Sequence, residues 1–336
     1  MNPPKINLAS VSTTCAKPTA MYLLVGKTNP KTGKSVILNR MPANGIPYEV
    51  IDRPCGKCSG CRIKKRMDLA IRLEHESQFH DHSWFVTVTY DDEHVPYAGS
   101  LVADHISKFI RSLRKKIKPT KCRFFAIGEY GENTLRPHYH FILFGPDFPD
   151  RELQYEAPIK GRSVSEISRM LGSAGIKYFR SPLLESVWKK GLVQITRTSP
   201  ATMQYVAKYH VLTVDGEAAE TWYTQKLPNG ETVKVEKPQS RMSRNPGIGR
   251  KWIEKYWTDV YPEGTMVDGK GAQFAAPPYY DSWLEKYHPD VYQELKERRK
   301  NAFTLERELS KHREAKVAAR KTKRDYSKGM EPRAKL

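Results

Sequence analysis

Two histidines one residue apart, His138 and His140, lie in an apolar run at residues 137–144. The run is predicted to be a strand, whose side chains alternate, so both imidazoles project from one face and could bind one metal ion. A short connector would pair this strand with residues 123–130 and set Glu129 opposite His138. Two nitrogens and a carboxylate suit Mg²⁺ or Mn²⁺ acting on a phosphate. The alternative is a pair of strand histidines without a ligand.

Two tyrosines, Tyr205 and Tyr209, form the second candidate group, and Lys208 lies between them. Their spacing of four places both phenols on one face of a predicted helix. A phenol has a pKa of about 10, so as a nucleophile it needs a nearby cation or an activated target. Lys208 could favour the phenolate or stabilise charge on a leaving oxygen. The alternative is that both rings pack in the core.

Three cysteines, Cys55, Cys58 and Cys61, are each separated by two residues, in a chain with five cysteines altogether. So few cysteines do not indicate a disulfide framework, which favours a reducing compartment. Three thiolates could hold a structural Zn²⁺ if a fourth ligand is supplied. The candidates for that ligand are Cys15, His75 and Cys122. An iron–sulfur cluster and three reduced cysteines in a tight turn are the alternatives.

The charge of the chain points to a polyanionic partner. Its 336 residues include 57 Lys and Arg against 37 Asp and Glu, a formal charge of +20. Residues 108–123 hold eight basic side chains and no acid. Those expected to contact DNA phosphates from one helix are Lys108, Arg111, Arg114, Lys115 and Lys118. The alternative for this charge run is a solvated helix face.

Two further expectations concern the partner and the membrane. Trp84, Tyr90 and Tyr139 are candidates for stacking on unpaired bases. The sequence has no apolar run of about 18 residues and no secretory signal at its start, so no membrane partner is expected.

The elements that must position these groups have the order β-α-β-β-(α)-β-α. The predicted elements are strand 83–90, helix 104–117, strands 123–130 and 138–144, a loop at 146–162, helices 163–171 and 182–188, strand 192–196 and helix 199–210. This order is typical of the split βαββαβ, or ferredoxin-like, arrangement. The fold class is therefore predicted to be α+β, an antiparallel sheet with helices on one face.

Four parts of the chain are expected. Residues 1–61 form an irregular segment that carries the cysteines, with short strands only at 21–25 and 35–38. Residues 62–212 form the core domain, which begins with a helix reaching residue 79. Residues 213–295 form an accessory region with a hairpin around Asn229, and residues 296–336 a basic helical or disordered tail.

Taken together, these motifs resemble a known group of enzymes. The histidine pair, the tyrosine pair and the strand at 85–90 resemble the HUH endonuclease superfamily, named after histidine, a bulky apolar residue and histidine. The resemblance is closer to the rolling-circle replication initiators of microviruses, especially gokushovirus-like ones. It rests on the motifs at 54–62, 128–131, 136–140 and 242–249, and covers roughly residues 54 to 290.

The resemblance implies a metal-dependent nickase that cuts single-stranded origin DNA and leaves a 5′-phosphotyrosine and a free 3′-OH. It implies that His138 and His140 hold the divalent ion with Glu129 as third ligand. Tyr205 and Tyr209 would be the nucleophiles, and a second transesterification would rejoin the strand. The alternatives are a relaxase or tyrosine transposase of the same superfamily and a non-catalytic, zinc-stabilised nucleic-acid-binding protein.

The sequence has no glycine-rich phosphate loop of the helicase type. Strand separation is therefore expected to fall to a host helicase and synthesis to a host polymerase, in the cytoplasm of the bacterial host.

Overall fold

The structure is a computed structural model. It describes residues 15–301 except 32, 34, 132, 133, 159–174, 213–216, 228, 262, 268–272 and 300. The helix predicted at 163–171 and nearly all of the predicted tail lie outside the described residues. The chain divides into two compact units, Met1–Lys255 and Tyr256–Leu336, and the candidate sites all belong to the first.

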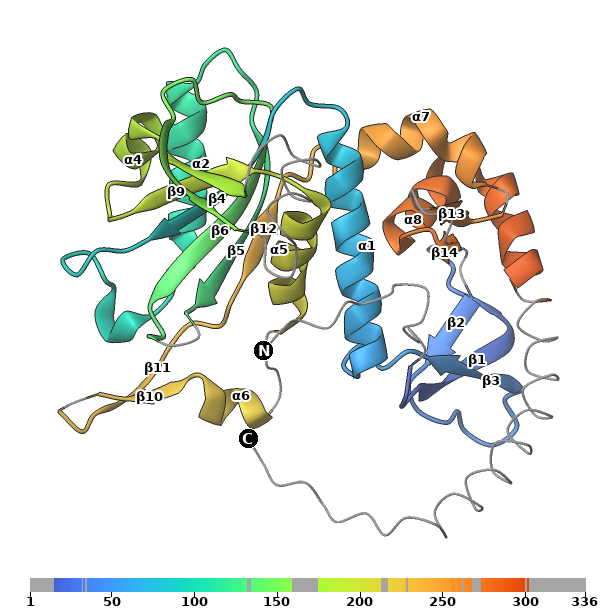
Figure 1. Ribbon diagram of the computed structural model, residues 1–336. Helices are drawn as coiled ribbons and strands as arrows, with labels where there is room; N and C mark the ends of the chain where they lie inside the picture. Colours follow the sequence, from blue (N-terminus) through green and yellow to red (C-terminus); the bar gives the residue numbers. More distant parts are fainter. Residues whose placement is uncertain are drawn as a thin grey trace, which may run out of the picture. The chain divides into compact units, whose positions relative to one another are not determined.

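A seven-stranded sheet forms the centre of the first unit, with the order β12-β5-β6-β4-β9-β8-β7 and antiparallel pairing throughout (Figure 1). Its strands are β4 (Ser83–Thr89), β5 (Arg123–Tyr130), β6 (Pro137–Phe144), β7 (Glu152–Ala157), β8 (Ile176–Arg180), β9 (Val193–Arg197) and β12 (Ser240–Met242). The predicted α+β class and the order of the core elements are confirmed. The strand β12 comes from the region predicted to be accessory.

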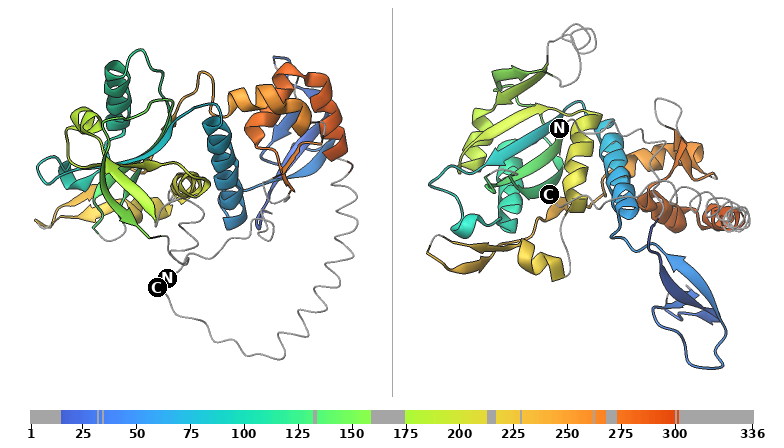
Figure 2. Two further views of the ribbon diagram at one scale, coloured as in Figure 1. Left: turned by 45° about the horizontal axis from the view of Figure 1, so that its top comes forward. Right: turned by 60° about the horizontal axis from the view of Figure 1, so that its bottom comes forward.

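Helices cover both faces of this sheet, so the expectation of helices on one face was wrong. The helices α2 (Ala103–Lys116) and α4 (Pro182–Trp188) pack on one face, and α1 (Ser59–Ser77) and α5 (Pro200–Leu212) on the other. The reason lies in strands such as β6, where alternate residues on both faces are apolar and require cover. Figure 2 shows α1 and α5 side by side.

Two strands of the sheet were not predicted. The strand β7 occupies part of the segment expected to be a loop, and β8 pairs with it. Most side chains of β7 are exposed and polar, so the segment has little apolar pattern of its own. Its strand character comes from the pairing with β8, which the local sequence does not reveal.

The region before α1 forms a small separate sheet with the order β2-β1-β3. It consists of β1 (Thr19–Thr28), β2 (Ser35–Leu38) and β3 (Tyr48–Arg53). Two of these strands fall where they were predicted, and β3 makes the segment more regular than expected. Among its described residues only Met21 is buried, so the sheet has almost no hydrophobic core.

The remaining elements are short. They are η2 (Tyr97–Gly99), α6 (Glu217–Trp222), β10 (Thr224–Lys226), β11 (Thr232–Lys234), α7 (Arg250–Val260), β13 (Thr265–Val267), β14 (Gln273–Ala275), α8 (Pro278–Tyr287) and a helix at 289–299. The hairpin predicted around Asn229 is confirmed as β10 and β11. No helix in the described part of the chain is both long enough and apolar enough to cross a membrane.

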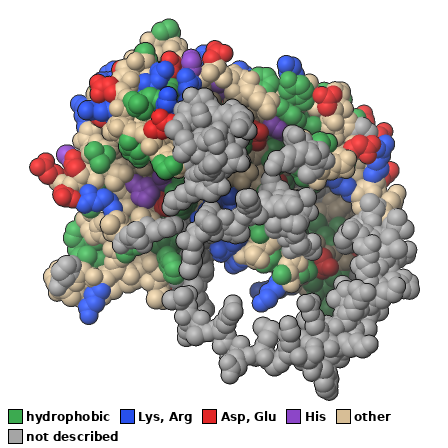
Figure 3. All heavy atoms as spheres, in the orientation of Figure 1, with side chains coloured by type: hydrophobic (Ala, Val, Ile, Leu, Met, Phe, Trp, Pro, Cys, Tyr) green, Lys and Arg blue, Asp and Glu red, His purple; other side chains and the backbone are tan. Residues whose placement is uncertain are grey.

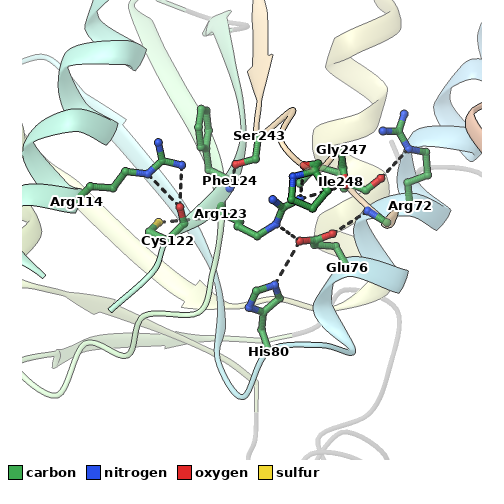
Figure 4. A network of polar contacts seen from close by, with 12 residues as sticks. Arg72, Glu76, His80, Arg114, Cys122, Arg123, Phe124, Ser243, Gly247 and Ile248 are labelled. Atoms are coloured by element: carbon green, nitrogen blue, oxygen red, sulfur yellow. Dashed lines mark hydrogen bonds and ion pairs between the residues drawn. The ribbon is translucent and has the colours of Figure 1, made fainter. Parts of the chain in front are cut away.

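A buried carboxylate fixes the segment after β12 to the core (Figure 4). The side chain of Glu76, on α1, is 2% exposed and accepts hydrogen bonds from Arg123 and, at 2.7 Å, from the backbone N–H of Gly249. The ring of His80 lies 3.3 Å away, and Arg123 also donates to the carbonyl of Gly247 at 3.1 Å. The motif at 242–249 is therefore held against α1 and β5.

We expect Glu76→Gln to lower the free energy of unfolding by about 3 kcal/mol at neutral pH, because it leaves Arg123 buried without its counter-charge. Burial alone would raise the pKa of Glu76, but His80, Arg123 and the Gly249 N–H lower it from 4.5 to about 2. A carboxylate with a depressed pKa stabilises the fold above the unfolded-state value and loses that contribution as the pH falls through the folded-state value. The difference between wild type and variant should therefore be constant above pH 4.5 and narrow below it.

Urea unfolding at several pH values measures this difference. Glu254→Gln is the control, since Glu254 forms an exposed pair with Arg250. A loss below about 1 kcal/mol for Glu76→Gln, the range of surface pairs, would contradict the account.

Candidate active site

The pairing of β5 with β6 brings three ligand side chains together. Glu129 lies directly opposite His138, as predicted, and Ile127 opposite His140. The Glu129 Oε2 atom is 3.1 Å from His140 Nε2 and 3.7 Å from His138 Nε2. One ligand atom from each of the three side chains lies within 4.8 Å of the others. The arrangement therefore matches the size of a site for one metal ion.

Hydrogen bonds orient both imidazoles so that Nε2 faces Glu129. The Nδ1 atom of His138 is 3.1 Å from the carbonyl of Arg136, which can only accept, so Nδ1 carries the proton and Nε2 keeps its lone pair. The Nδ1 atom of His140 is 2.9 Å from the Thr87 hydroxyl. Such contacts on the far side of the ring are typical of metal-binding histidines.

Two buried polar atoms point into this cluster. Neither Glu129 Oε2 nor His140 Nε2 has a hydrogen bond of normal geometry to any described residue, although they face each other. Burial would raise the pKa of Glu129, but the two imidazoles outweigh it and lower that pKa, while burial lowers the pKa of His140. At neutral pH the cluster thus offers one carboxylate and a neutral imidazole. A divalent cation fits this donor set.

The helix α5 places both candidate tyrosines over the imidazoles. Met203, Val206 and Ala207 are buried against the sheet face that carries His140, which seats the helix there. The ring centroids of Tyr205 and Tyr209 lie 5.5 Å and 6.1 Å from that of His140. The phenols and imidazoles are therefore on one side of the sheet.

The two phenols differ in their surroundings. Tyr209 donates a hydrogen bond of 3.2 Å to Tyr205, whose side chain is 41% exposed. Burial, the hydrogen bond to Tyr205 and the charge of Glu129 all raise the pKa of Tyr209. The ammonium of Lys208 lies 5.4 Å from the Tyr209 ring centroid, so its charge is close to this ring. Phe85 contributes an aromatic wall, 5.2 Å from the His140 ring.

The basic residues expected to contact DNA are not part of this cluster. Lys108, Arg111, Arg114 and Lys115 lie on α2, and Lys118 lies just beyond it; α2 covers the opposite face of the sheet. Arg114 donates to the carbonyl of Cys122 at 2.8 Å, and Lys108 pairs with Asp104 at 3.0 Å. On the face drawn in Figure 3, basic side chains occur at several separate places. Contact between α2 and DNA stays a prediction.

The expectation that Trp84, Tyr90 or Tyr139 stacks on bases was wrong. All three are fully buried in the core beneath α2 and α4. The even-numbered residues of β4 and the odd-numbered residues of β6 point to that face, and the Tyr90 and Tyr139 hydroxyls are 3.0 Å apart inside it. They are therefore structural.

The cysteines form a second cluster at the start of α1. Cys15 joins Cys55, Cys58 and Cys61, with all four sulfurs within 4.8 Å of one another. The other two candidates for a fourth ligand lie elsewhere. Cys122 is buried in the core beneath α2, and the ring of His75 stacks on Trp252 with centroids 3.6 Å apart.

Sequence comparisons point to viral replication proteins. The family model for replication-associated protein ORF2 matches residues 83–213, which contain the whole histidine and tyrosine cluster. Replication-associated protein VP4 of Bdellovibrio phage phiMH2K is 29% identical over 235 residues, covering 68% of this chain and 65% of its own. Replication-associated protein ORF2 of Spiroplasma virus 4 is 28% identical over 239 residues, with coverages of 68% and 66%.

A third relative, replication-associated protein ORF4 of Chlamydia phage 1, is 32% identical over 159 residues, covering 46% of this chain and 37% of its own. The alignments span less than two thirds of each of these relatives. No solved structure matches the chain. The family match across the candidate site and these three relatives show that the chain belongs to the replication-associated proteins of microviruses.

Proposed function

We propose that this chain initiates rolling-circle replication by nicking single-stranded origin DNA through a covalent 5′-phosphotyrosine. The observation that carries the proposal is the position of two phenols over a buried Glu129, His138 and His140 cluster, with ring centroids 5.5 Å and 6.1 Å from His140. Membership of the replication-associated family supports a role in viral DNA replication.

Glu129, His138 and His140 would hold Mg²⁺ or Mn²⁺. When bound, such an ion polarises a phosphoryl oxygen and neutralises developing charge. The chain contributes orientation: the Arg136 carbonyl and the Thr87 hydroxyl fix the two imidazoles, and Phe85 packs against His140. Fixed ligands need little reorganisation when the phosphate arrives.

In the proposed step a tyrosine oxygen attacks the scissile phosphorus. A bond forms between the phenolic oxygen and phosphorus, and the bond from phosphorus to O3′ breaks. The phenol gives up its proton and the leaving O3′ gains one, so a 3′-OH results. One phosphodiester replaces another, so no nucleotide triphosphate is consumed and a 3′-OH can reverse the step.

We expect Tyr205 to make the first cut and Tyr209 the second. The phenol of Tyr205 is accessible to DNA, whereas Tyr209 is half-buried with a raised pKa. In single-turnover reactions, Tyr209→Phe should form the first adduct but not transfer it, and Tyr205→Phe should lose about 90% or more of the first adduct. Denaturing gels measure both, and the reverse pattern would contradict this order.

Overlapping single-stranded oligonucleotides that cover the phage genome encoding the chain test the proposal. In Mn²⁺, one sequence should be nicked, with the protein on its 5′ end and a 3′-OH that a polymerase can extend. EDTA should stop the reaction and added Mg²⁺ or Mn²⁺ restore it. Binding without cleavage would favour the non-catalytic alternative. A nick outside the replication origin would favour a relaxase or transposase.

The proposal extends to partners and location. The free 3′-OH is a primer for a host polymerase, and strand separation is left to a host helicase. Since the relatives are proteins of viruses that infect bacteria, we place this activity in the cytoplasm of the bacterial host.

A further inference from the structure

We propose that Cys15, Cys55, Cys58 and Cys61 bind one structural Zn²⁺ that fastens the N-terminal sheet to α1. The four sulfurs lie within 4.8 Å of one another, and those of Cys15 and Cys58 are 3.9 Å apart. In a tetrahedral site with Zn–S bonds of about 2.3 Å, sulfurs lie about 3.8 Å apart. The cluster thus has the number and spacing of ligands of a closed zinc site, and the histidine cluster is distinct from it.

Backbone N–H groups point at these sulfurs. Cys58 donates to the Cys55 sulfur at 3.3 Å, Cys55 to the Cys15 sulfur at 3.2 Å and Ala16 to the Cys58 sulfur at 3.4 Å. Such hydrogen bonds stabilise thiolate, which is the form that binds metal. They also tie the segment around Cys15 to the turn at 55–58, which lies 40 residues away in sequence.

The turn between the ligands has a backbone suited to this role. Gly56 adopts φ +74°, a conformation that side chains rarely adopt, and this lets the chain turn sharply between Cys55 and Cys58. The ammonium of Lys65 donates to the Gly56 carbonyl at 3.1 Å. Four thiolates around Zn²⁺ carry a net charge of −2, so a lysine and the start of α1 at Ser59 are favourable neighbours.

The N-terminal sheet needs such a staple because it lacks a core. Among the described residues before α1 only Met21 is buried, and sheets this small are rarely stable without a metal or disulfide. Cys15 precedes β1 and Cys55 follows β3, so one ion would close the sheet at both ends. It would also anchor the sheet to α1, which packs against the tyrosine helix α5.

Metal analysis of the purified full chain tests the site. We expect about one zinc per chain in wild type, and a loss of about 90% or more of it in Cys15→Ser. Cys122→Ala, which removes a cysteine outside the cluster, is the matched control and should keep its zinc. Wild type reloaded with Co²⁺ should show the visible absorption of a tetrahedral thiolate site, and Cys15→Ser should not.

Hydrogen exchange tests the structural role. Removing zinc should raise exchange in β1 and β3 by about tenfold or more, while β5 and β6 stay protected. Stoichiometric iron, a disulfide among these cysteines in freshly purified protein, or the absence of bound metal would overturn the proposal. Zinc retained by Cys15→Ser would overturn the four-cysteine assignment, and unchanged exchange would overturn the staple.

Discussion

Replacing both Tyr205 and Tyr209 with phenylalanine is expected to lower formation of the covalent DNA adduct by about 10⁴-fold or more, to below detection. Phenylalanine keeps the rings that pack against Phe85 and His140 but removes both attacking oxygens. Denaturing gels with labelled single-stranded DNA measure the adduct. A double variant that still forms it would show that the nucleophile lies elsewhere.

The same double variant should still bind DNA, with an affinity that falls as salt is raised, because phosphate contacts do not require the phenols. Tyr97→Phe is the control, since Tyr97 is exposed and bonds to Glu231. It should form the adduct at the wild-type rate. Loss of both binding and cleavage in the double variant would instead indicate a damaged fold.

Changing a ligand of the proposed metal site is expected to have the second largest effect. Glu129→Gln keeps the shape of the side chain but removes its charge, and we expect cleavage to fall by about a thousandfold. His140→Ala should have a similar effect, although its burial means that the fold must be checked by circular dichroism. Calorimetric titration with Mn²⁺ should show binding to wild type and a large loss of affinity in both variants.

His94→Gln is the matched control for these ligand variants. His94 is partly exposed and pairs with Asp91 at 2.6 Å. It should cleave DNA and bind Mn²⁺ as wild type does. Normal cleavage by Glu129→Gln and His140→Ala would remove the metal assignment.

The parts of the site that depend on local geometry could be predicted from the sequence. The alternation of a strand puts His138 and His140 on one face, and a short connector sets Glu129 opposite His138. The helical period places Tyr205 and Tyr209 together. In each case the residues concerned are close in the sequence, so few arrangements were open to the chain.

Features that depend on distant contacts could not be predicted. Thr87 reaches His140 only because β4 pairs with β6, although β5 lies between them in the sequence. Cys15 could not be preferred over His75 or Cys122 until the fold placed it beside the other cysteines.

The errors have a common physical cause. An aromatic residue on a strand can face the core or the solvent, and Trp84 and Tyr139 turned out to face the core because a second layer of helices covers that side of the sheet. The same second layer carries the basic helix α2 away from the histidine cluster. The number of faces that helices cover is a property of the whole sheet, and short windows of sequence do not contain it.

Peptide mapping of the covalent adduct tests the central claim most directly. Wild-type protein is incubated with its nicked single-stranded DNA and Mn²⁺, digested with nuclease and protease, and analysed by mass spectrometry. The account predicts a nucleotide 5′-phosphate attached to Tyr205 or Tyr209, absent when EDTA is present. A phosphate on any other residue, or strand cleavage that leaves no protein-linked nucleotide, would contradict it.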